Sequence, residues 1–238
     1  MSTNSIIPFL VIGAAGIAFS IGYCLQKYQE NYESTLPELF CTRLSNTEVN
    51  EERRVINALK KRKNLTPVVK SELTKDTLHR LAYDVNGALF HYSGNCVLLA
   101  RAILYNLREG ANILSVANTH PFFQGIKPKQ SDKILFGKDL AIVKSNIQGI
   151  TALESEILQH HVRTGEIYYI VQSKGFPINL GFYELTVGHH FNAVVLKVNH
   201  APQVQFVDAW KTSNPTPSKQ ELDKKFRGSG AFCIAVLR

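Results

Sequence analysis

The chain has 238 residues, of which 45% are hydrophobic and 19% are charged, and its formal net charge is +8. This hydrophobic fraction excludes a chain that is mainly disordered, and the length suits one domain with an appended segment or two small domains. The four cysteines, Cys24, Cys41, Cys96 and Cys233, lie far apart and form no CxxC pair. This spacing excludes a disulfide-rich scaffold and favours a reducing compartment.

An uncharged apolar run lies near the start of the chain. Ile6–Leu25 holds 20 residues without a charge, and an α-helix of that length spans about 30 Å, the hydrocarbon thickness of a bilayer. We therefore expect residues 1–27 to form a single-pass membrane anchor, with residues 6–25 in the membrane. A cleaved signal peptide and a buried core helix remain as alternatives.

Residues 28–82 form a basic segment that we expect to be a helical stalk. Apolar spacing predicts helices at Asn50–Arg62 and Ser71–Tyr83. Glu51–Arg80 contains nine Lys and Arg against four acidic residues, so this stretch supplies +5 of the net charge. A solvated helix face explains the run better than phosphate binding. No zinc-finger or RNA-recognition pattern is present, so no nucleic-acid partner is expected.

Residues 83–238 are expected to be the catalytic domain, with helices first and strands later. The first predicted elements are a helix at Val97–Leu107 ending at Gly110, a strand at Ile113–Ala117, a loop at Thr119–Lys138 and a helix at Leu140–His161, at least from Thr151 onward. The predicted strands are Ile167–Gln172, Phe191–Val198, Val204–Asp208 and Phe232–Leu237. This order predicts an α+β fold with a largely antiparallel sheet.

A polar triplet, Gly94-Asn95-Cys96, stands directly before the first apolar helix of that domain. The first amides of a helix lack intrahelical partners and carry partial positive charge, so a thiol placed there has its thiolate stabilised. Gly94 permits close approach of the backbone, and Asn95 is a capping type of residue. Cys96 is therefore the candidate nucleophile.

A thiol nucleophile needs a base, and the base needs a group that orients it. His189 and His190 stand where one predicted strand begins, and Asp208 stands where the next one ends. Antiparallel neighbours bring such positions together, so an imidazole can take the thiol proton while the carboxylate fixes its tautomer. Because side chains alternate along a strand, only one of the two histidines is expected to face the thiol.

Three stretches resemble the papain-like fold, and more narrowly the papain-fold toxin and effector domains of bacteria. They are GNC at Gly94–Cys96, GHHFNAVV at Gly188–Val195 and VQFVDAWK at Val204–Lys211. The resemblance covers Tyr83–Arg238 and implies N-terminal helices, with a catalytic cysteine at a helix start, packed on the sheet. It implies Cys96 as nucleophile, His189 as base with His190 as the alternative, and Asp208 as the orienting carboxylate.

The chain departs from the family pattern in one respect. Papain-like enzymes place an oxyanion-stabilising glutamine a few residues before the cysteine, and Ala88–Ser93 contains none. The backbone N–H of Cys96 is one expected donor to the oxyanion. The candidates for the second donor, or for substrate contacts, are Asn95, Asn86 and Gln124. Trp210 is expected either to pack beneath the imidazole, to line the substrate groove or to act as a hydrophobic plug.

These residues predict a cysteine hydrolase that attacks protein amide bonds through a thioester, and the resemblance implies a protease-like bacterial effector or toxin. Glutamine deamidation and transglutaminase-type acyl transfer can use the same triad and stay open. A membrane-tethered binding module without turnover is the alternative of another class. The expected partners are a protein substrate and the membrane. No cofactor is expected, and without HExxH or CxxC no metal site is expected.

The anchor predicts a membrane-bound protein whose catalytic domain is cytosolic, because Lys27 and the later basic residues follow the apolar run. The alternative location is that of a secreted bacterial effector acting in a host cell.

Overall fold

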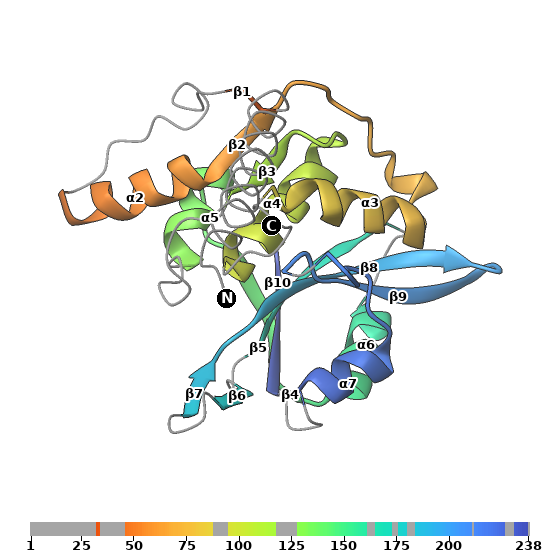
Figure 1. The fold of residues 1–238 in the computed structure, drawn as a ribbon. Coiled ribbons are helices and arrows are strands. Elements are labelled where there is room, and N and C mark those ends of the chain that lie inside the picture. The colour runs from red at the N-terminus through yellow and green to blue at the C-terminus, as the bar shows by residue number, and fades with distance from the viewer. Residues whose placement is uncertain are drawn as a thin grey trace, which may run out of the picture.

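The computed structural model describes residues 32–33, 46–87, 95–117, 128–160, 165–172, 176–179, 184–210, 212–226 and 231–237. Its helices are α2 (Asn46–Ala58), α3 (Lys75–Val85), α4 (Cys96–Glu109), α5 (Pro128–Phe136), α6 (Ile150–His160) and α7 (Lys219–Phe226), with a 3-10 turn at Lys70–Glu72. A central sheet separates two groups of helices: α2 to α5 lie on one side of it, and α6 and α7 lie on the other (Figure 1). The fold is therefore of the predicted α+β class.

The central sheet has five strands in the order β4-β10-β5-β8-β9, and every neighbouring pair is antiparallel. The strands are β4 (Ala141–Gln148), β10 (Ala231–Val236), β5 (Ile167–Gln172), β8 (His190–Val198) and β9 (Ala201–Val207). The last two form a hairpin whose turn residues, Asn199 and His200, have φ values of 50° and 65°. Such paired positive φ values match the twist of the flanking strands.

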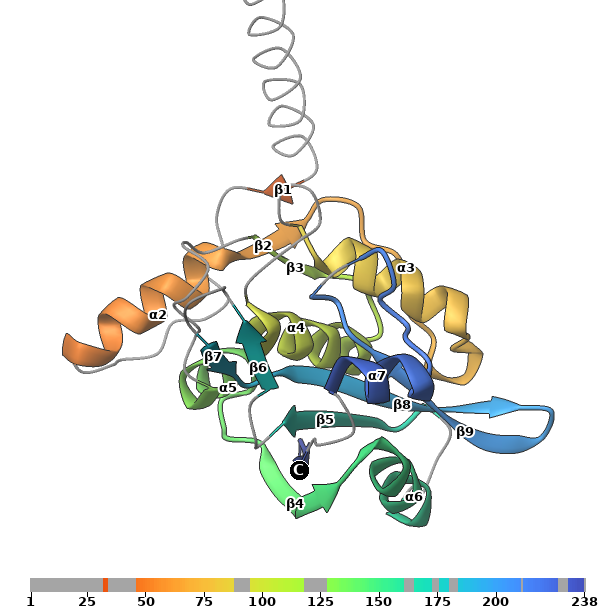
Figure 2. The same cartoon turned by 60° about the horizontal axis from the view of Figure 1, so that its bottom comes forward.

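The strand β8 is covered on both faces, which explains its nearly continuous apolar sequence. Val194 and Leu196 pack in one hydrophobic core with residues of α4, whereas the alternating Ala193 and Val195 pack in a second core with residues of α6 and α7. Figure 2 shows the same layering from a second direction. As a result, the N-terminal end of β8 lies between the two groups of helices.

The basic segment shares the first of these cores. Val55 of α2 and Leu78 of α3 are fully buried in the cluster that also contains Leu99 and Ile103 of α4. A small sheet of β1 (Tyr32–Glu33), β2 (Leu59–Arg62) and β3 (Leu114–Val116) joins this part of the chain to the segment that follows α4. The described part of residues 28–82 is therefore continuous in packing with the domain that carries the candidate cysteine.

Several element predictions need correction. Leu59–Arg62 ends the predicted helix in the sequence but forms β2, because it pairs with β3. Ala141–Gln148 is the edge strand β4, where the sequence pattern suggested a helix. The predicted loop Thr119–Lys138 contains the helix α5. The pair β6 (Phe176–Asn179) and β7 (Glu184–Val187), and the helix α7, were not predicted.

The membrane-spanning part of the fold prediction is wrong for the structure as described. No helix within the described ranges is long and apolar enough to cross a bilayer. Ile6–Leu25, to which the prediction referred, lies outside those ranges.

Candidate functional site

Cys96 is the first residue of α4, the position that its sequence context predicts. The Asn95 carbonyl accepts a hydrogen bond from the Leu99 N–H at 2.9 Å, which starts the helical ladder. Leu98 and Leu99 are buried, whereas Cys96 carries a free, half-buried thiol. The packed apolar stripe of the helix therefore holds the sulfur at the helix N-terminus, where backbone amides favour a thiolate.

His189 lies directly before β8 and only 2% of it is exposed. Its carbonyl accepts from the Gln172 N–H at 2.9 Å, so its backbone is tied to the end of β5. The imidazole stacks on Phe191 with 6.0 Å between ring centroids, and Trp210 packs against it at 5.2 Å. These aromatic contacts fix the plane of the ring.

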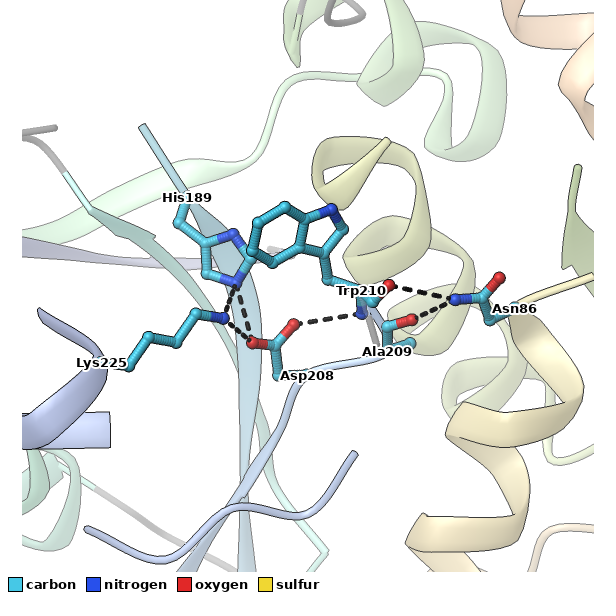
Figure 3. A network of polar contacts seen from close by, with 6 residues as sticks. All are labelled: Asn86, His189, Asp208, Ala209, Trp210 and Lys225. Carbon is cyan, nitrogen blue, oxygen red and sulfur yellow. Dashed lines mark hydrogen bonds and ion pairs between the residues drawn. The ribbon is translucent and has the colours of Figure 1, made fainter. Parts of the chain in front are cut away.

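Asp208 follows the last residue of β9 and lies beside that imidazole. The antiparallel register pairs Asn192 with Val207, so the start of one strand meets the end of the other. Asp208 Oδ2 is 2.8 Å from His189 Nε2, and Figure 3 draws the two side chains facing each other. The other carboxylate oxygen accepts from the Trp210 N–H at 3.2 Å. The carboxylate is thus held by the turn that follows it.

The Cys96 side chain lies close enough to the His189 imidazole for a hydrogen-bond interaction that raises the pKa of the ring. Because Nε2 is directed at Asp208, Nδ1 is the ring nitrogen left for the sulfur. The structure therefore brings Cys96, His189 and Asp208 together, with the imidazole between the thiol and the carboxylate. Thiol nucleophiles use such an arrangement for activation.

Electrostatics favour a charged imidazole at this site. Burial disfavours the imidazolium, but the charge of the Asp208 carboxylate and the hydrogen bonds that the ring donates to Asp208 and Cys96 together raise the pKa of His189 to about 9. Burial also opposes the carboxylate charge, yet His189 and Lys225 hold the pKa of Asp208 well below its usual range. At neutral pH the pair is an imidazolium and a carboxylate.

Lys225 is a member of the site that the sequence did not indicate. It lies on α7, and its Nζ is 2.5 Å from Asp208 Oδ2 and 3.1 Å from His189 Nε2. The ammonium also stands 4.9 Å from the centre of the Trp210 ring. Its positive charge lowers the pKa of His189 and so opposes the effect of Asp208. Only its place beside the buried Phe226 on a short amphipathic helix could have suggested an inward position.

Asn86, an expected contact for the oxyanion, has a different position in the structure. It is fully buried, and its side-chain N–H groups donate to the carbonyl of Ala209 at 2.6 Å and to that of Trp210 at 3.3 Å (Figure 3). Asn86 therefore fastens the turn that follows Asp208. The Trp210 ring packs against the imidazole, as the first of its three expected roles requires.

His190 belongs to a separate polar network. Its Nδ1 lies 2.6 Å from the hydroxyl of Tyr169, and that hydroxyl accepts a hydrogen bond from Arg101. Arg101 is 2% exposed and forms a two-point ion pair with Asp132 of α5. Burial lowers the pKa of His190 to about 3, and the charges of Arg101 and His189 act in the same direction. His190 is thus neutral where His189 is charged.

Of the remaining predicted contacts, Asn95 is buried at the N-cap of α4, where its side chain makes no capping hydrogen bond. Gln124 lies outside the described ranges. The structure thus joins His189, and not His190, to Asp208, which leaves His190 without the carboxylate partner that a base at this site would need.

Comparisons with known proteins identify relatives of the chain. Residues 33–237 match the family described as Salmonella plasmid virulence protein SpvD. Virulence protein vsdE of Salmonella typhimurium and Virulence protein SpvD of Salmonella dublin are each 37% identical to the chain over 197 residues, which covers 80% of this chain and 87% of the relative.

Two solved structures titled as variants of Salmonella effector SpvD have the same fold. The glycine variant matches with a TM-score of 0.73 and 35% identity, over 85% of this chain and 97% of that one. The arginine variant matches with a TM-score of 0.65 and 30% identity over the same shares.

Proposed function

Because the chain belongs to the SpvD family of bacterial virulence effectors, we propose that it is a papain-like cysteine hydrolase that attacks amide bonds of proteins. Cys96 is the nucleophile, His189 the general base and acid, and Asp208 the group that orients the imidazole. One observation carries the proposal: a buried imidazole hydrogen-bonds to a carboxylate and lies close enough to a thiol to interact with it.

The first half of the reaction forms a thioester. At neutral pH the imidazolium of His189 holds the proton that Cys96 gives up, and the sulfur attacks the amide carbon as a thiolate to give a tetrahedral oxyanion. As the oxyanion collapses, the C–N bond breaks and the imidazolium donates its proton to the leaving amine. A raised pKa suits His189 to this step, because the ring holds a proton at neutral pH until the amine leaves.

The second half of the reaction hydrolyses the thioester and regenerates the free enzyme. Water attacks the thioester carbon while His189 accepts its proton, and the C–S bond breaks to release a carboxylic acid and the Cys96 sulfur. Asp208 stays ionised throughout, because His189 and Lys225 hold its pKa low. It stabilises the imidazolium and keeps Nε2 turned away from the sulfur.

The amide that is cleaved determines the outcome. A backbone amide gives proteolysis, a glutamine side chain gives deamidation, and an amine in place of water gives acyl transfer. We propose proteolysis first. The test is mass spectrometry of host-cell proteins exposed to the full chain or to Cys96→Ser. New peptide termini identify proteolysis, and a gain of about one dalton on glutamine identifies deamidation.

Identical spectra from the two proteins would contradict hydrolysis and favour a binding module. An independent check is the rate of alkylation by iodoacetamide near pH 6. Cys96 is expected to react faster than Cys233, whose thiol is also free, and His189→Ala is expected to remove that advantage. Equal slow labelling of both cysteines would refute an activated thiol.

A further inference from the structure

His190, the residue after the proposed base, hydrogen-bonds to Tyr169, and Tyr169 in turn to Arg101. These bonds fix the tautomer of the His190 imidazole. Arg101 has only donors, so the Tyr169 oxygen must accept from it. Tyr169 is 1% exposed, and the one acceptor within reach of its O–H among the described residues is His190 Nδ1, at 2.6 Å. The hydroxyl therefore donates to Nδ1.

A neutral imidazole that accepts at Nδ1 carries its proton on Nε2. His190 is neutral at physiological pH, since burial and the charges of Arg101 and His189 lower its pKa to about 3. Its Nε2 has no hydrogen-bond partner in the described part of the chain, and it is not among the buried polar atoms left unpaired there. Because His190 is also only half-buried, this N–H is a donor open to a ligand.

The network that holds this donor reaches the candidate nucleophile. Arg101 Nη1 lies 3.4 Å from the carbonyl of Val97, the residue after Cys96. Tyr169 is near enough to Cys96 for the charge of the sulfur to act on its hydroxyl. At its other end, His190 directly follows His189, which interacts with the thiol. Arg101 itself is fixed by Asp132, so the donor is preorganised.

Two of the groups that could serve as the second donor to the oxyanion do not do so in the described site. The family glutamine is missing from the sequence, and the Asn86 amide is engaged with two backbone carbonyls. We propose that the Nε2–H of His190 donates to the carbonyl oxygen of the substrate as it becomes an oxyanion, beside the backbone N–H of Cys96. This inference rests on the proposed hydrolase function.

The proposal predicts that two reactions of the same thiol respond differently to a change at His190. Acylation by 4-nitrophenyl acetate passes through a tetrahedral oxyanion, whereas alkylation by iodoacetamide displaces iodide and forms none. In the full chain, His190→Phe is expected to slow acylation of Cys96 by about 100-fold. Alkylation is expected to stay within about twofold, because the thiol keeps His189 and Asp208.

Two matched variants distinguish the loss of the His190 hydrogen-bond donor from a change in the packing of its side chain. His190→Gln retains a side-chain N–H and is expected to recover part of the acylation rate. Tyr169→Phe removes the hydroxyl that fixes the tautomer and is expected to lower acylation less than His190→Phe does, again without changing alkylation. These two variants carry the test if His190→Phe does not fold.

An unchanged acylation rate in His190→Phe, or equal losses in acylation and alkylation, would overturn the assignment of His190 while leaving the hydrolase intact. The rate at which 4-nitrophenyl acetate acylates the Cys96→Ser variant serves as the background for these measurements. If the unsubstituted chain does not exceed that background, the proposed hydrolase itself fails, and the role of His190 fails with it.

Discussion

Replacing Asp208 with asparagine tests the central interaction of the candidate site. The substitution keeps the shape of the side chain but removes the charge that raises the pKa of His189 to about 9 from its ordinary value of 6.5. Without the carboxylate, burial and Lys225 both act against the imidazolium, so the pKa is expected to fall to 6.5 or below. A fall of about 2.5 in pKa corresponds to about 3 kcal/mol.

The consequence is large near neutral pH. At pH 8 an imidazole with a pKa of about 9 is about 90% protonated, whereas one with a pKa of 6.5 is about 3% protonated. Titration of the His189 ring nitrogens by NMR measures this directly. In the unfolding of the full chain by urea, the imidazolium contributes stability below pH 6.5 that is lost as the pH rises through about 9. In Asp208→Asn, the free energy of unfolding is expected to stay constant where that of the unsubstituted chain falls as the pH rises toward 9.

The control for this substitution is Asp223→Asn, which removes one carboxylate from α7 and is expected to leave the titration of His189 near that of the unsubstituted chain. A pKa of His189 that stays near 9 in Asp208→Asn would refute the reasoning, because it would show that the carboxylate does not hold the imidazolium.

Three further changes probe the surroundings of the site. Lys225→Met removes a cation 3.1 Å from His189 Nε2, so the pKa of His189 is expected to rise further in the same NMR titration; a fall would contradict the proposed opposition of charges. His190 has a folded pKa of about 3, below its ordinary 6.5. The free energy of unfolding, measured in urea, is therefore expected to fall as the pH falls from 6.5 toward 3. The fall is expected to be smaller in His190→Gln. Arg101→Met leaves the buried Asp132 carboxylate unpaired and is expected to lower the free energy of unfolding by about 3–5 kcal/mol, measured in urea; a loss below about 1 kcal/mol would show that the pair is relaxed or solvated.

The choice between the two histidines shows where pattern analysis reaches its limit. Alternation along a strand implied that only one of His189 and His190 faces the thiol, but it does not give the register. His189 precedes the first residue of β8 and is placed by its carbonyl bond to β5 and by three aromatic contacts. Apart from the contact with Phe191, these contacts come from segments distant in sequence, so no local pattern encodes them.

The failed element predictions have a similar cause. The edge strand β4 is mostly exposed and pairs only with β10 within the described sheet, so its sequence lacks the apolar alternation of a half-buried strand. Leu59–Arg62 continues the apolar spacing of α2, but its pairing with β3 overrides local preference.

The amino-acid sequence by itself determined the α+β class, the helix at Cys96 and the strands next to the two histidines and Asp208. It therefore indicated Cys96, Asp208 and a histidine that is either His189 or His190. Periodicity, turn residues and helix starts are local properties, and these features depend on them. Only the tertiary structure decided that His189 joins Asp208, that Lys225 reaches both, and that Arg101 and Tyr169 fix the tautomer of His190. Those assignments depend on strand register and on side chains packed from distant segments, which sequence spacing does not specify.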